Sequence, residues 1–314
     1  MKKGLIVLFC LLAMTGQAFA AEWPTKALNL VVPYGAGGNS DFNARAIAKY
    51  LPDLIGVPVV VTNMPGSGGT IGAAQVKNSK PDGYTILVHQ LSLSIAEAAG
   101  MADYGIQDFD LGCVLSKSSP EVLVAQTKVP YNNIPELIEY TKQHPGEVKL
   151  TANTGATTMW TAIGLLKAGA KLNVVSSGGS GERLQVVLGG HADIVPLNFN
   201  MIEAYVKDGT LKILGSVSDS KSELIPDVKT LREVGVNAGY DYMNTMIFPK
   251  GTDPQKIEKV CAAVGEIINK NESYRAEMKT AYQPPTWMNV KDTNAHWYGQ
   301  RDELQAIKDT LQGK

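Results

Sequence analysis

The residues of this chain that could do chemistry are gathered in short clusters of glycine, serine, threonine and asparagine. Each cluster follows a β-branched run and precedes a helical pattern, so its backbone N–H groups would lie at the positive end of a helix dipole. Glycine allows close approach of the backbone to a ligand, and the hydroxyl groups add donors. The main clusters lie at 34–41, 63–70, 153–158 and 177–181. If two domains point these turns at a shared cleft, they predict a site for a molecule that carries carboxylates.

The arginines contribute little to this predicted site. Five arginines follow residue 20, and none lies inside a Gly-rich turn: Arg45, Arg183, Arg232, Arg275 and Arg301. Arg45 lies one turn into a predicted helix and Arg183 opens another, so either could approach a cleft, but we expect both on solvated helix surface. Main-chain donors must then carry most of the recognition.

The motifs of nucleotide-using enzymes are incomplete in this chain. Gly35 and Gly37 open a dinucleotide-like fingerprint, but Ser40 stands where the third glycine belongs, and Asn63 replaces the acidic residue that would hold a ribose. Walker and nucleophile-elbow motifs are missing, and the four histidines lack metal-binding spacing. His89 could face the cleft as a ligand contact. We expect no catalytic residue, metal or cofactor. The alternative to a carboxylate-binding protein is a nucleotide-dependent α/β enzyme.

Length, charge and composition limit the kind of protein that this chain can be. Its 314 residues carry 29 Lys and Arg against 30 Asp and Glu, a formal net charge of -1, and 44% of them are hydrophobic. These values predict a chain that folds by itself, and they exclude the basic footprint of a nucleic-acid-binding protein. At about 150 residues per domain the length suggests roughly two domains. We expect a monomer without a nucleic-acid partner.

The first twenty residues have the pattern of a cleaved secretory signal. Lys2 and Lys3 precede an apolar stretch from Leu5 to Met14, and Ala18-Phe19-Ala20 has the small-x-small form that signal peptidase accepts. The apolar run is shorter than the roughly 20 residues that span a membrane. We therefore expect residues 1–20 to be removed on export to a bacterial periplasm.

Two cysteines follow this segment, Cys113 and Cys261. They form no C-x-x-C pair, so the spacing of zinc sites and of thioredoxin-type motifs is missing. A disulfide between them and two buried free thiols are both compatible with the sequence.

The elements that must position the Gly-rich turns alternate between strands and helices, which predicts an α/β fold. The first series has strands at 28–33, 57–62 and 84–88 and helices at 42–54 and 71–78, and we expect Ser40 or Asp41 to cap the first helix. The second series has strands at 122–125, 148–152, 172–176, 192–197 and 211–217, with helices between them. The C-terminal strand at 245–248 and helices near 254–270 and 294–312 are too few for a separate sheet domain.

We therefore expect two α/β domains, with the C-terminal segment returning to complete the first. Residues 21–122 and 220–314 would form the first domain, and residues 123–219 the second. The two places where the chain passes between the domains would form a hinge.

Several segments in order match one known family. They are Trp23-Pro24-Thr25-Lys26, Val32-Pro33-Tyr34 through Asp41, Asn63 through Gly69 with Ile71-Gly72-Ala73, Pro81-Asp82-Gly83-Tyr84-Thr85, Leu188 through Asp193, and Thr230-Leu231 with Glu233-Val234-Gly235. On these segments the chain resembles the solute-binding proteins of tripartite tricarboxylate transporters, periplasmic receptors of the Bordetella-uptake-gene type. The resemblance implies a two-domain Venus flytrap fold that closes on a small organic acid. It also implies delivery to a permease of one large and one small integral membrane subunit, or presentation to a membrane kinase by a sensor subunit.

The resemblance also implies where the ligand binds. By position the contacts would be Tyr34, Asn39 and Ser40 in the first turn, Gly66, Ser67 and Gly68 in the second, Thr154, Thr157 and Thr158 in the other domain, then Ser177 and Asn198. Met64 stands where the family commonly has arginine, and Met159-Trp160 replaces a more polar pair. Trp160 belongs either to the core or to the floor of an apolar pocket. A small carboxylate with a partly apolar body is as plausible a ligand as citrate.

Overall fold

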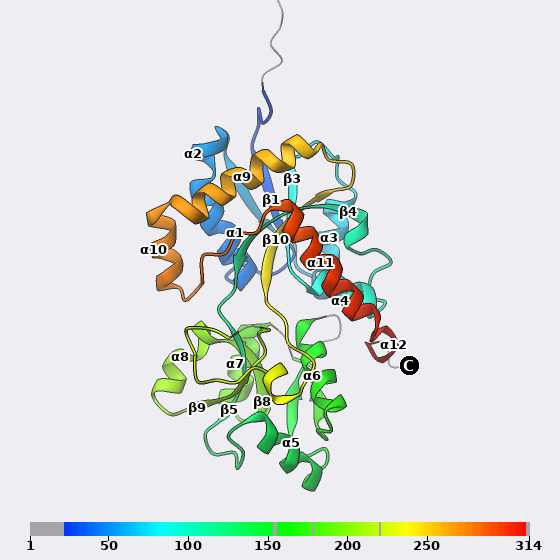
Figure 1. Ribbon diagram of the computed structural model, residues 1–314, viewed down its shortest axis with the longest axis vertical. Coiled ribbons are helices and arrows are strands. Elements are labelled where there is room, and N and C mark those ends of the chain that lie inside the picture. Colours follow the sequence, from blue (N-terminus) through cyan, green and yellow to red (C-terminus); the bar gives the residue numbers. More distant parts are fainter. Residues whose placement is uncertain (1–21, 153–155, 178, 220, 312–314) are drawn as a thin grey trace, which may run out of the picture.

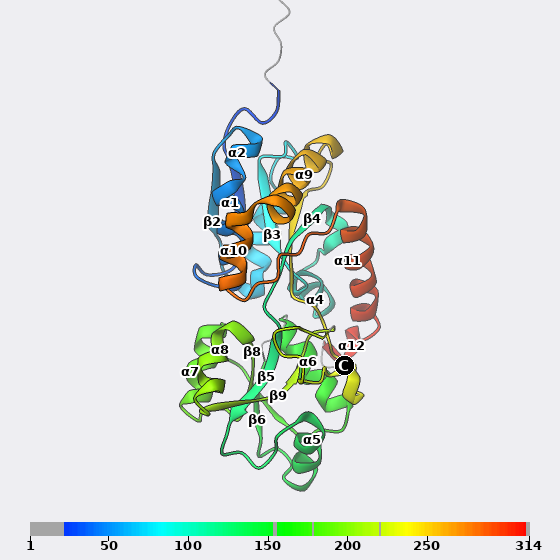
Figure 2. The same cartoon turned by 60° about the vertical axis from the view of Figure 1, so that its left-hand side comes forward.

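Two five-stranded sheets organise the chain, each at the centre of one lobe (Figure 1). The structure is a computed structural model that describes residues 22–152, 156–177, 179–219 and 221–311. The predicted signal segment, residues 1–20, lies outside the described residues. Helices cover both sheets, and the two lobes stack along the long axis of the molecule (Figures 1 and 2). The structure thus confirms the predicted two-domain α/β fold.

The first lobe is built on a mixed sheet of strand order β2-β1-β3-β10-β4. Its strands are β1 (Leu28–Val32), β2 (Val59–Asn63), β3 (Thr85–His89), β4 (Phe109–Lys117) and β10 (Met243–Pro249). Strand β1 pairs in parallel with β2 and β3, and β10 runs antiparallel between β3 and β4. Its helices are α1 (Asn39–Tyr50), α2 (Pro52–Ile55), α3 (Thr70–Lys77), α4 (Ser92–Ala98), α9 (Pro254–Lys270), α10 (Glu272–Thr280) and α11 (Val290–Gln305). The C-terminal strand therefore returns to the first sheet, as the sequence predicts.

The second lobe has the strand order β7-β6-β8-β5-β9. Its strands are β5 (Glu121–Gln126), β6 (Lys149–Thr151), β7 (Asn173–Val175), β8 (Ile194–Asn198) and β9 (Leu211–Ser216). Its helices are α5 (Ile134–Gln143), α6 (Thr157–Lys167), α7 (Ser180–Leu188) and α8 (Phe199–Lys207). Strands β6, β7 and β8 are parallel, so their carboxyl ends, with the turns that follow, meet at one edge of the sheet.

Two chain segments cross between the lobes and are bonded to each other. The first is the short link from β4 to β5, and the second leads from β9 to β10. The backbone N–H of Ser118 donates to the carbonyl oxygen of Tyr242 at 2.9 Å, and Lys117 pairs with Asp241 at 2.9 Å. The two crossings therefore lie side by side, which limits the lobes to motions about a narrow hinge.

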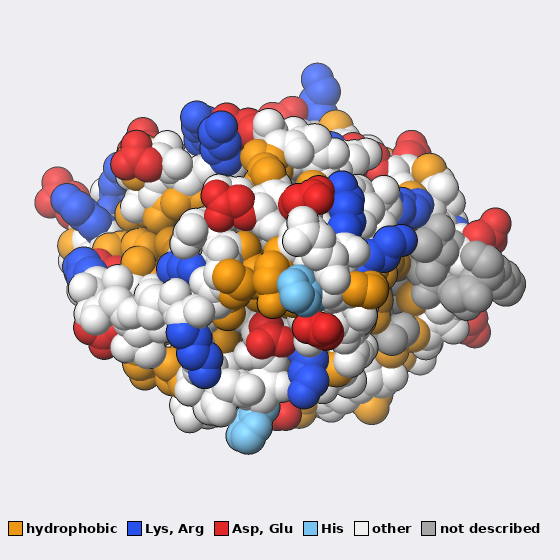
Figure 3. Space-filling model, turned by 90° about the horizontal axis from the view of Figure 1, so that it is seen from below, with side chains coloured by type: hydrophobic (Ala, Val, Ile, Leu, Met, Phe, Trp, Pro, Cys, Tyr) orange, Lys and Arg blue, Asp and Glu red, His pale blue; other side chains and the backbone are white. Residues whose placement is uncertain are grey.

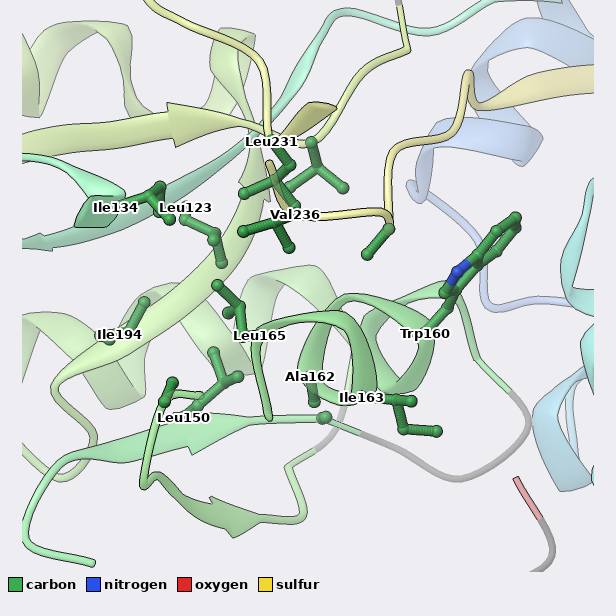
Figure 4. Close-up of a cluster of buried hydrophobic side chains, with 14 of the residues drawn as sticks. Leu123, Ile134, Leu150, Trp160, Ala162, Ile163, Leu165, Ile194, Leu231 and Val236 are labelled. Carbon is green, nitrogen blue, oxygen red and sulfur yellow. The ribbon is translucent and has the colours of Figure 1, made fainter. Parts of the chain in front are cut away.

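Most of the second crossing packs on the second lobe. Leu231 and Val236 are buried in the same apolar cluster as Leu123 of β5 (Figure 4). Ala238 lies so close to α6 that a Cβ added to Gly164 would stand 2.1 Å from the Cβ of Ala238. This packing favours a domain boundary near residue 242 rather than at the predicted residue 220, and we propose that boundary here.

Trp160 is part of the core. It projects from α6, is 4% exposed, and its ring stacks on Tyr240 with centroids 6.0 Å apart (Figure 4). Of the two sequence interpretations, burial in the core is therefore correct.

The C-terminal helix joins the two lobes a third time. Helix α11 lies on the first lobe and leads through Leu304, which is buried in the cluster of the second lobe, to α12 (Lys308–Leu311) beside α6 (Figure 2). Arg301 of this helix donates to the carboxylate of Glu97 of α4 through Nη2 at 2.8 Å and through Nε at 3.2 Å. The lobes thus contact each other on the side away from β2 as well as through the crossings.

The two cysteines settle an alternative that the sequence left open between a disulfide and two buried free thiols. Cys113 and Cys261 are free thiols, buried in one cluster of the first lobe.

No helix in the described part of the chain is long and apolar enough to span a membrane. On the face in Figure 3, at the free end of the second lobe, acidic and basic side chains are interspersed without a patch of one sign.

A buried acid holds the first Gly-rich turn in place. Asp41 accepts hydrogen bonds from the N–H of Gly37 at 2.8 Å, from Nε of Arg45 at 3.0 Å and from Nδ2 of Asn63 at 2.9 Å. Asn63 also donates to the carbonyl oxygen of Tyr34 at 3.0 Å. Helix α1 begins earlier than predicted, with Gly38 as N-cap, so the expected capping role of Ser40 or Asp41 is wrong. Its carboxylate instead joins the turn to β2.

The same contacts set the ionisation of Asp41. Burial raises the pKa of the carboxyl, but the hydrogen bonds from Arg45, Gly37 and Asn63 outweigh burial and hold the pKa below its ordinary value. A carboxyl whose folded pKa is depressed stabilises the fold above its unfolded pKa and loses that contribution as the pH falls through the folded pKa.

We expect Asp41→Asn to lower the free energy of unfolding by about 2 kcal/mol at pH 7, because hydrogen bonds to a charged group contribute about 1.5–3 kcal/mol. Urea denaturation followed by circular dichroism measures this loss. The difference between variant and wild type should begin to shrink as the pH falls below about 4, where the unfolded carboxyl becomes protonated, and should vanish below the depressed folded pKa, where the carboxyl is protonated in both states.

The matched control is Glu139→Gln on the exposed face of α5. Glu139 pairs only at the surface with Lys142, at 3.2 Å and with 62% of its side chain exposed, so the change should stay within about 0.5 kcal/mol. Equal losses in both variants, or a loss for Asp41→Asn that persists unchanged down to acid pH, would contradict this role of Asp41.

Candidate functional site

A cleft of about 890 Å³ lies between the two lobes. Residues of the first lobe, of the second lobe and of the second crossing line it. They are 34–40, Phe42, Gly68, Gln90, Ser92, Glu121, Ala156, Thr157, Thr158, Ser176, Ser177, 179–181, Arg183, Asn198, Asn200, Met201, Tyr242 and Gln283. Both lobes therefore offer their Gly-, Ser- and Thr-rich turns to the same space, as the sequence predicts for these turns.

Four helices direct N-termini without side-chain caps at this cleft. They are α1, α6, α7 and α8, and their N-cap residues, Gly38, Ala156, Gly179 and Asn198, all line the cleft. The first three have no polar side-chain atom that could cap. Asn198 makes no side-chain cap within the described residues, and its Nδ2 donates to the carbonyl oxygen of Ser119 at 2.9 Å. The first N–H groups of α8 are bonded instead to the first crossing, that of Phe199 to the carbonyl oxygen of Pro120 at 2.9 Å and that of Asn200 to Oγ of Ser119 at 3.2 Å. The positive ends of four dipoles thus face one volume, and the helix starts of α1, α6 and α7 bring backbone N–H groups without a side-chain cap to it.

Four helices whose N-caps lie outside the cleft lining have side-chain caps, whereas α2, α3 and α4 have none. The N-caps of α5, α9, α10 and α11 are Asn133, Asp253, Asn271 and Asn289, and each accepts a hydrogen bond from a backbone N–H of the first turn. At α1, α6 and α7 the N-cap residue supplies no such acceptor, and these helix starts line a cleft that can admit an acceptor from outside the protein.

Tyr34 is held as a neutral donor on the first-lobe side of the cleft. Its hydroxyl accepts a hydrogen bond from Nε2 of Gln90 at 2.7 Å, and Gln90 is itself fixed by Ser92, whose backbone N–H donates to Oε1 at 2.8 Å. Burial raises the pKa of Tyr34 well above its ordinary value. The phenol therefore keeps its proton at physiological pH and can donate it in a hydrogen bond.

Asn39 and Ser40 begin α1 and connect the cleft to the hinge. Oδ1 of Asn39 accepts from the hydroxyl of Ser118 at 2.6 Å and from Nδ2 of Asn244 at 3.2 Å. Ser118 lies in the first crossing. Ser40 is 2% exposed, and its hydroxyl makes no hydrogen bond within the described residues. Both predicted residues line the cleft, next to the place where the chain passes between the lobes.

The second predicted turn contributes less than expected. Gly68 lines the cleft, whereas Gly66 and Ser67 do not. Gly69, at φ +99°, lies where a Cβ would stand 3.0 Å from Nε2 of His89 and 3.2 Å from the Tyr34 hydroxyl. A glycine is therefore required there for the turn to approach the first-lobe wall.

On the second-lobe side, four predicted residues line the cleft and one cannot be placed. Thr157 and Thr158 form the first turn of α6, Ser177 follows β7, and Asn198 ends β8. Thr154 lies outside the described residues. Each of the four follows a strand of one sheet, which is why they converge.

Arg183 corrects the expectation that both candidate arginines lie on solvated surface. It is 8% exposed and lines the cleft, with Nε donating to the carbonyl oxygen of Pro196 and Nη2 to Oγ of Ser180, both at 3.0 Å. It follows the first turn of α7, and that turn faces the cleft rather than water. Arg45, by contrast, is exposed as expected, at 52% of its side chain.

Glu121 is a cleft residue that sequence reasoning missed. It is the first residue of β5 and 6% exposed, and it accepts a hydrogen bond from the hydroxyl of Tyr240. Nη2 of Arg183 lies 3.9 Å from its Oε1. Burial raises the pKa of Glu121, and Arg183 opposes this rise. Its position one residue after Pro120, at a predicted crossing, was the signal that could have pointed to it.

Gln90, Tyr242 and Gln283 were also missed. Each lies just beyond a strand or helix end, where a single sequence gives no Gly-rich signature. Oε1 of Gln283 accepts from the N–H of Ser119 at 3.1 Å, so it too contacts the first crossing. Burial raises the pKa of Tyr242, which stays protonated.

His89 does not reach the cleft. It is 1% exposed, and its Nδ1 lies 2.8 Å from the N–H of Gln90. Burial lowers its pKa to about 4, so the ring is neutral at physiological pH. The described residues contain no group of three or more His, Cys, Asp or Glu side chains that could hold a metal ion.

Comparisons with known proteins agree on one family. A family model described as tripartite tricarboxylate transporter family receptor matches residues 43–308. The chain is 29% identical over 273 residues to protein BugT of Bordetella pertussis, covering 83% of each chain, and 29% identical over 283 residues to a Cupriavidus necator protein, covering 89% and 85%.

Solved structures agree in fold. The periplasmic binding protein BugD matches at a TM-score of 0.77 and 25% identity, over 92% of this chain and 98% of that one. MatC of Rhodopseudomonas palustris with bound malate has a TM-score of 0.77 at 22% identity, over 91% of this chain and all of that one. Because the family model spans most of the sequence and the same fold recurs, the chain belongs to the tripartite tricarboxylate transporter family receptors.

Proposed function

We propose that this protein captures a small organic carboxylate in the interlobe cleft and delivers it to a membrane transporter with one large and one small integral subunit. The protein acts as a periplasmic solute-binding receptor rather than as an enzyme. The observation that carries the proposal is the set of three helix N-termini without side-chain caps, those of α1, α6 and α7, that face the cleft from both lobes.

The chemistry of the cleft suits an anion with several acceptor oxygens. A carboxylate offers two oxygens that together accept about four hydrogen bonds. Main-chain N–H groups at α1 and α6, with the hydroxyl groups of Tyr34, Thr157 and Thr158, lie around the space that it would occupy. Because these donors belong to different lobes, an anion between them would draw the lobes together.

The relatives support the ligand class. The similar structure of MatC contains malate, and that of the R. palustris protein Rpa4515, with a TM-score of 0.78 at 22% identity, contains adipate. Both compounds are dicarboxylates of modest size, and a cleft of about 890 Å³ can hold either with solvent to spare. The transporter partnership and the periplasmic location rest on family membership and on the signal-like residues 1–20.

A ligand screen tests the proposal directly. We expect at least one mono-, di- or tricarboxylate to raise the melting temperature of the mature protein and to bind with a measurable dissociation constant in isothermal titration. At a hundredfold excess over that constant the ligand adds about 2.7 kcal/mol to the free energy of unfolding, because it binds only the folded state. Binding of uncharged sugars alone, with no response to any carboxylate, would end the proposal.

A pair of matched variants tests the role of the helix N-termini. Ser40 is the second residue of α1, and Ser273 is the second residue of α10, which points away from the cleft. Proline is tolerated in a first turn, as Pro135 shows in α5, but it removes the backbone N–H. We expect Ser40→Pro to weaken binding of the carboxylate found in the screen about tenfold or more, since it removes a donor to a charged acceptor.

Ser273→Pro is the control, because it makes the same change at a helix start outside the cleft. We expect it to leave the dissociation constant unchanged. Isothermal titration of both variants, with circular dichroism to verify folding, decides the matter. An equal loss of affinity in the two variants would show that the α1 N-terminus has no special part in binding.

A further inference from the structure

An acid in the wall of the cleft is not explained by capture of a carboxylate alone. Glu121 lines the cleft, is 6% exposed, and follows the first crossing directly. A second carboxylate brought next to it in a space shielded from water would be repelled. We propose that Glu121 selects carboxylates that also carry a hydrogen-bond donor, a hydroxyl or an ammonium group. This inference rests on the proposed function and deepens it.

The contacts of Glu121 leave acceptor capacity toward the cleft. The hydroxyl of Tyr240 donates to Oε2. Oε1 lies 3.9 Å from Nη2 of Arg183, which is beyond hydrogen-bond distance. Since each carboxylate oxygen has two lone-pair sites, Oε1 can accept from a bound molecule without losing a contact within the protein.

Arg183 balances the negative charge of Glu121 without a hydrogen bond to its carboxylate, since the 3.9 Å between Nη2 and Oε1 exceeds hydrogen-bond distance. Its Nε and Nη2 are directed to the carbonyl oxygen of Pro196 and to Oγ of Ser180, which tie α7 to β8. The guanidinium therefore reduces the cost of burying the acid through charge alone, at a separation that leaves the carboxylate free to turn toward a ligand. A donor from the ligand would complete the set of hydrogen bonds that a buried carboxylate needs.

The cleft as a whole is neutral, which favours a ligand with two kinds of polar group. Among the lining residues that the structure describes, Glu121 and Arg183 carry the formal charges, and the phenols of Tyr34 and Tyr242 stay protonated. Helix N-termini supply donors for a carboxylate, and Glu121 supplies the strong acceptor. A hydroxy acid or an amino acid matches both features, whereas an unsubstituted diacid matches only the first.

The test compares ligands that differ in one substituent. Three series are compared, each with the unsubstituted diacid as parent: succinate with malate and aspartate, glutarate with 2-hydroxyglutarate and glutamate, and adipate with 2-aminoadipate. The best ligand from the carboxylate screen is added, together with its unsubstituted parent or with its hydroxyl and amino derivatives. Isothermal titration at pH 7 gives each dissociation constant. We expect a hydroxyl or amino derivative to bind about tenfold or more tightly than its parent, and the two arms distinguish which donor is preferred.

The Glu121→Gln variant assigns that preference to this residue. The amide keeps the size of the side chain and loses its charge, so the ratio of dissociation constants between parent and derivative should fall to within about threefold. Glu139→Gln, on the exposed surface of α5, should leave the ratio unchanged. If Glu121→Gln does not fold, as judged by circular dichroism, the wild-type comparison alone decides.

The possible results distinguish a failure of the proposed role of Glu121 from a failure of the proposed function. Wild-type protein that binds parent acids as tightly as their derivatives would overturn the role of Glu121 and leave the proposed function intact. An unchanged ratio in Glu121→Gln would do the same. Protein that binds no carboxylate of any kind would instead overturn the proposed function, and this inference with it.

Discussion

The constraint on which the rest of this structure depends is that backbone N–H groups at a helix start need an acceptor. At three helices that meet in the interlobe cleft the N-cap residue supplies none, since it is Gly38, Ala156 or Gly179. Water can satisfy these groups, but an anion does so better because it also interacts with the helix dipoles. The parallel strands bring the helix starts together, and the two lobes place them on opposite sides of one space.

Recognition and movement share residues in this arrangement. Asn39 starts α1 at the cleft and accepts a hydrogen bond from Ser118 of the first crossing, while Gln283 and Asn198 hold Ser119 from the two lobes. The crossings also bond to each other at Ser118 and Tyr242. The first turn of α1 is therefore joined to the hinge by direct hydrogen bonds, without a long chain of intermediate residues.

The sequence predicted the elements better than it predicted the site. Strands that precede Gly-rich turns were placed within about two residues, because β-branched runs bounded by glycine have few alternatives. Strand β4 was missed, since Phe109–Lys117 is buried on both faces and shows no alternation. Polar clusters located Asn39 and Thr157 in the cleft, but Arg183 and Glu121 carry no local signature. Whether a charged residue at the start of an element faces water or the other lobe depends on packing that one sequence does not show.

Leaving helix starts uncapped at the cleft has a cost in stability that other parts of the fold offset. A side-chain cap contributes about 1 kcal/mol, so the three missing caps of α1, α6 and α7 correspond to roughly 3 kcal/mol, a large share of the stability of an ordinary domain. The first turn recovers part of this through Asp41, whose carboxylate joins Gly37, Arg45 and Asn63. In the second lobe, Arg183 ties the start of α7 to β8 in a comparable way. In both lobes a buried charge just inside the helix keeps the binding turn in shape, so the N–H groups stay available to a ligand without the turn losing its structure.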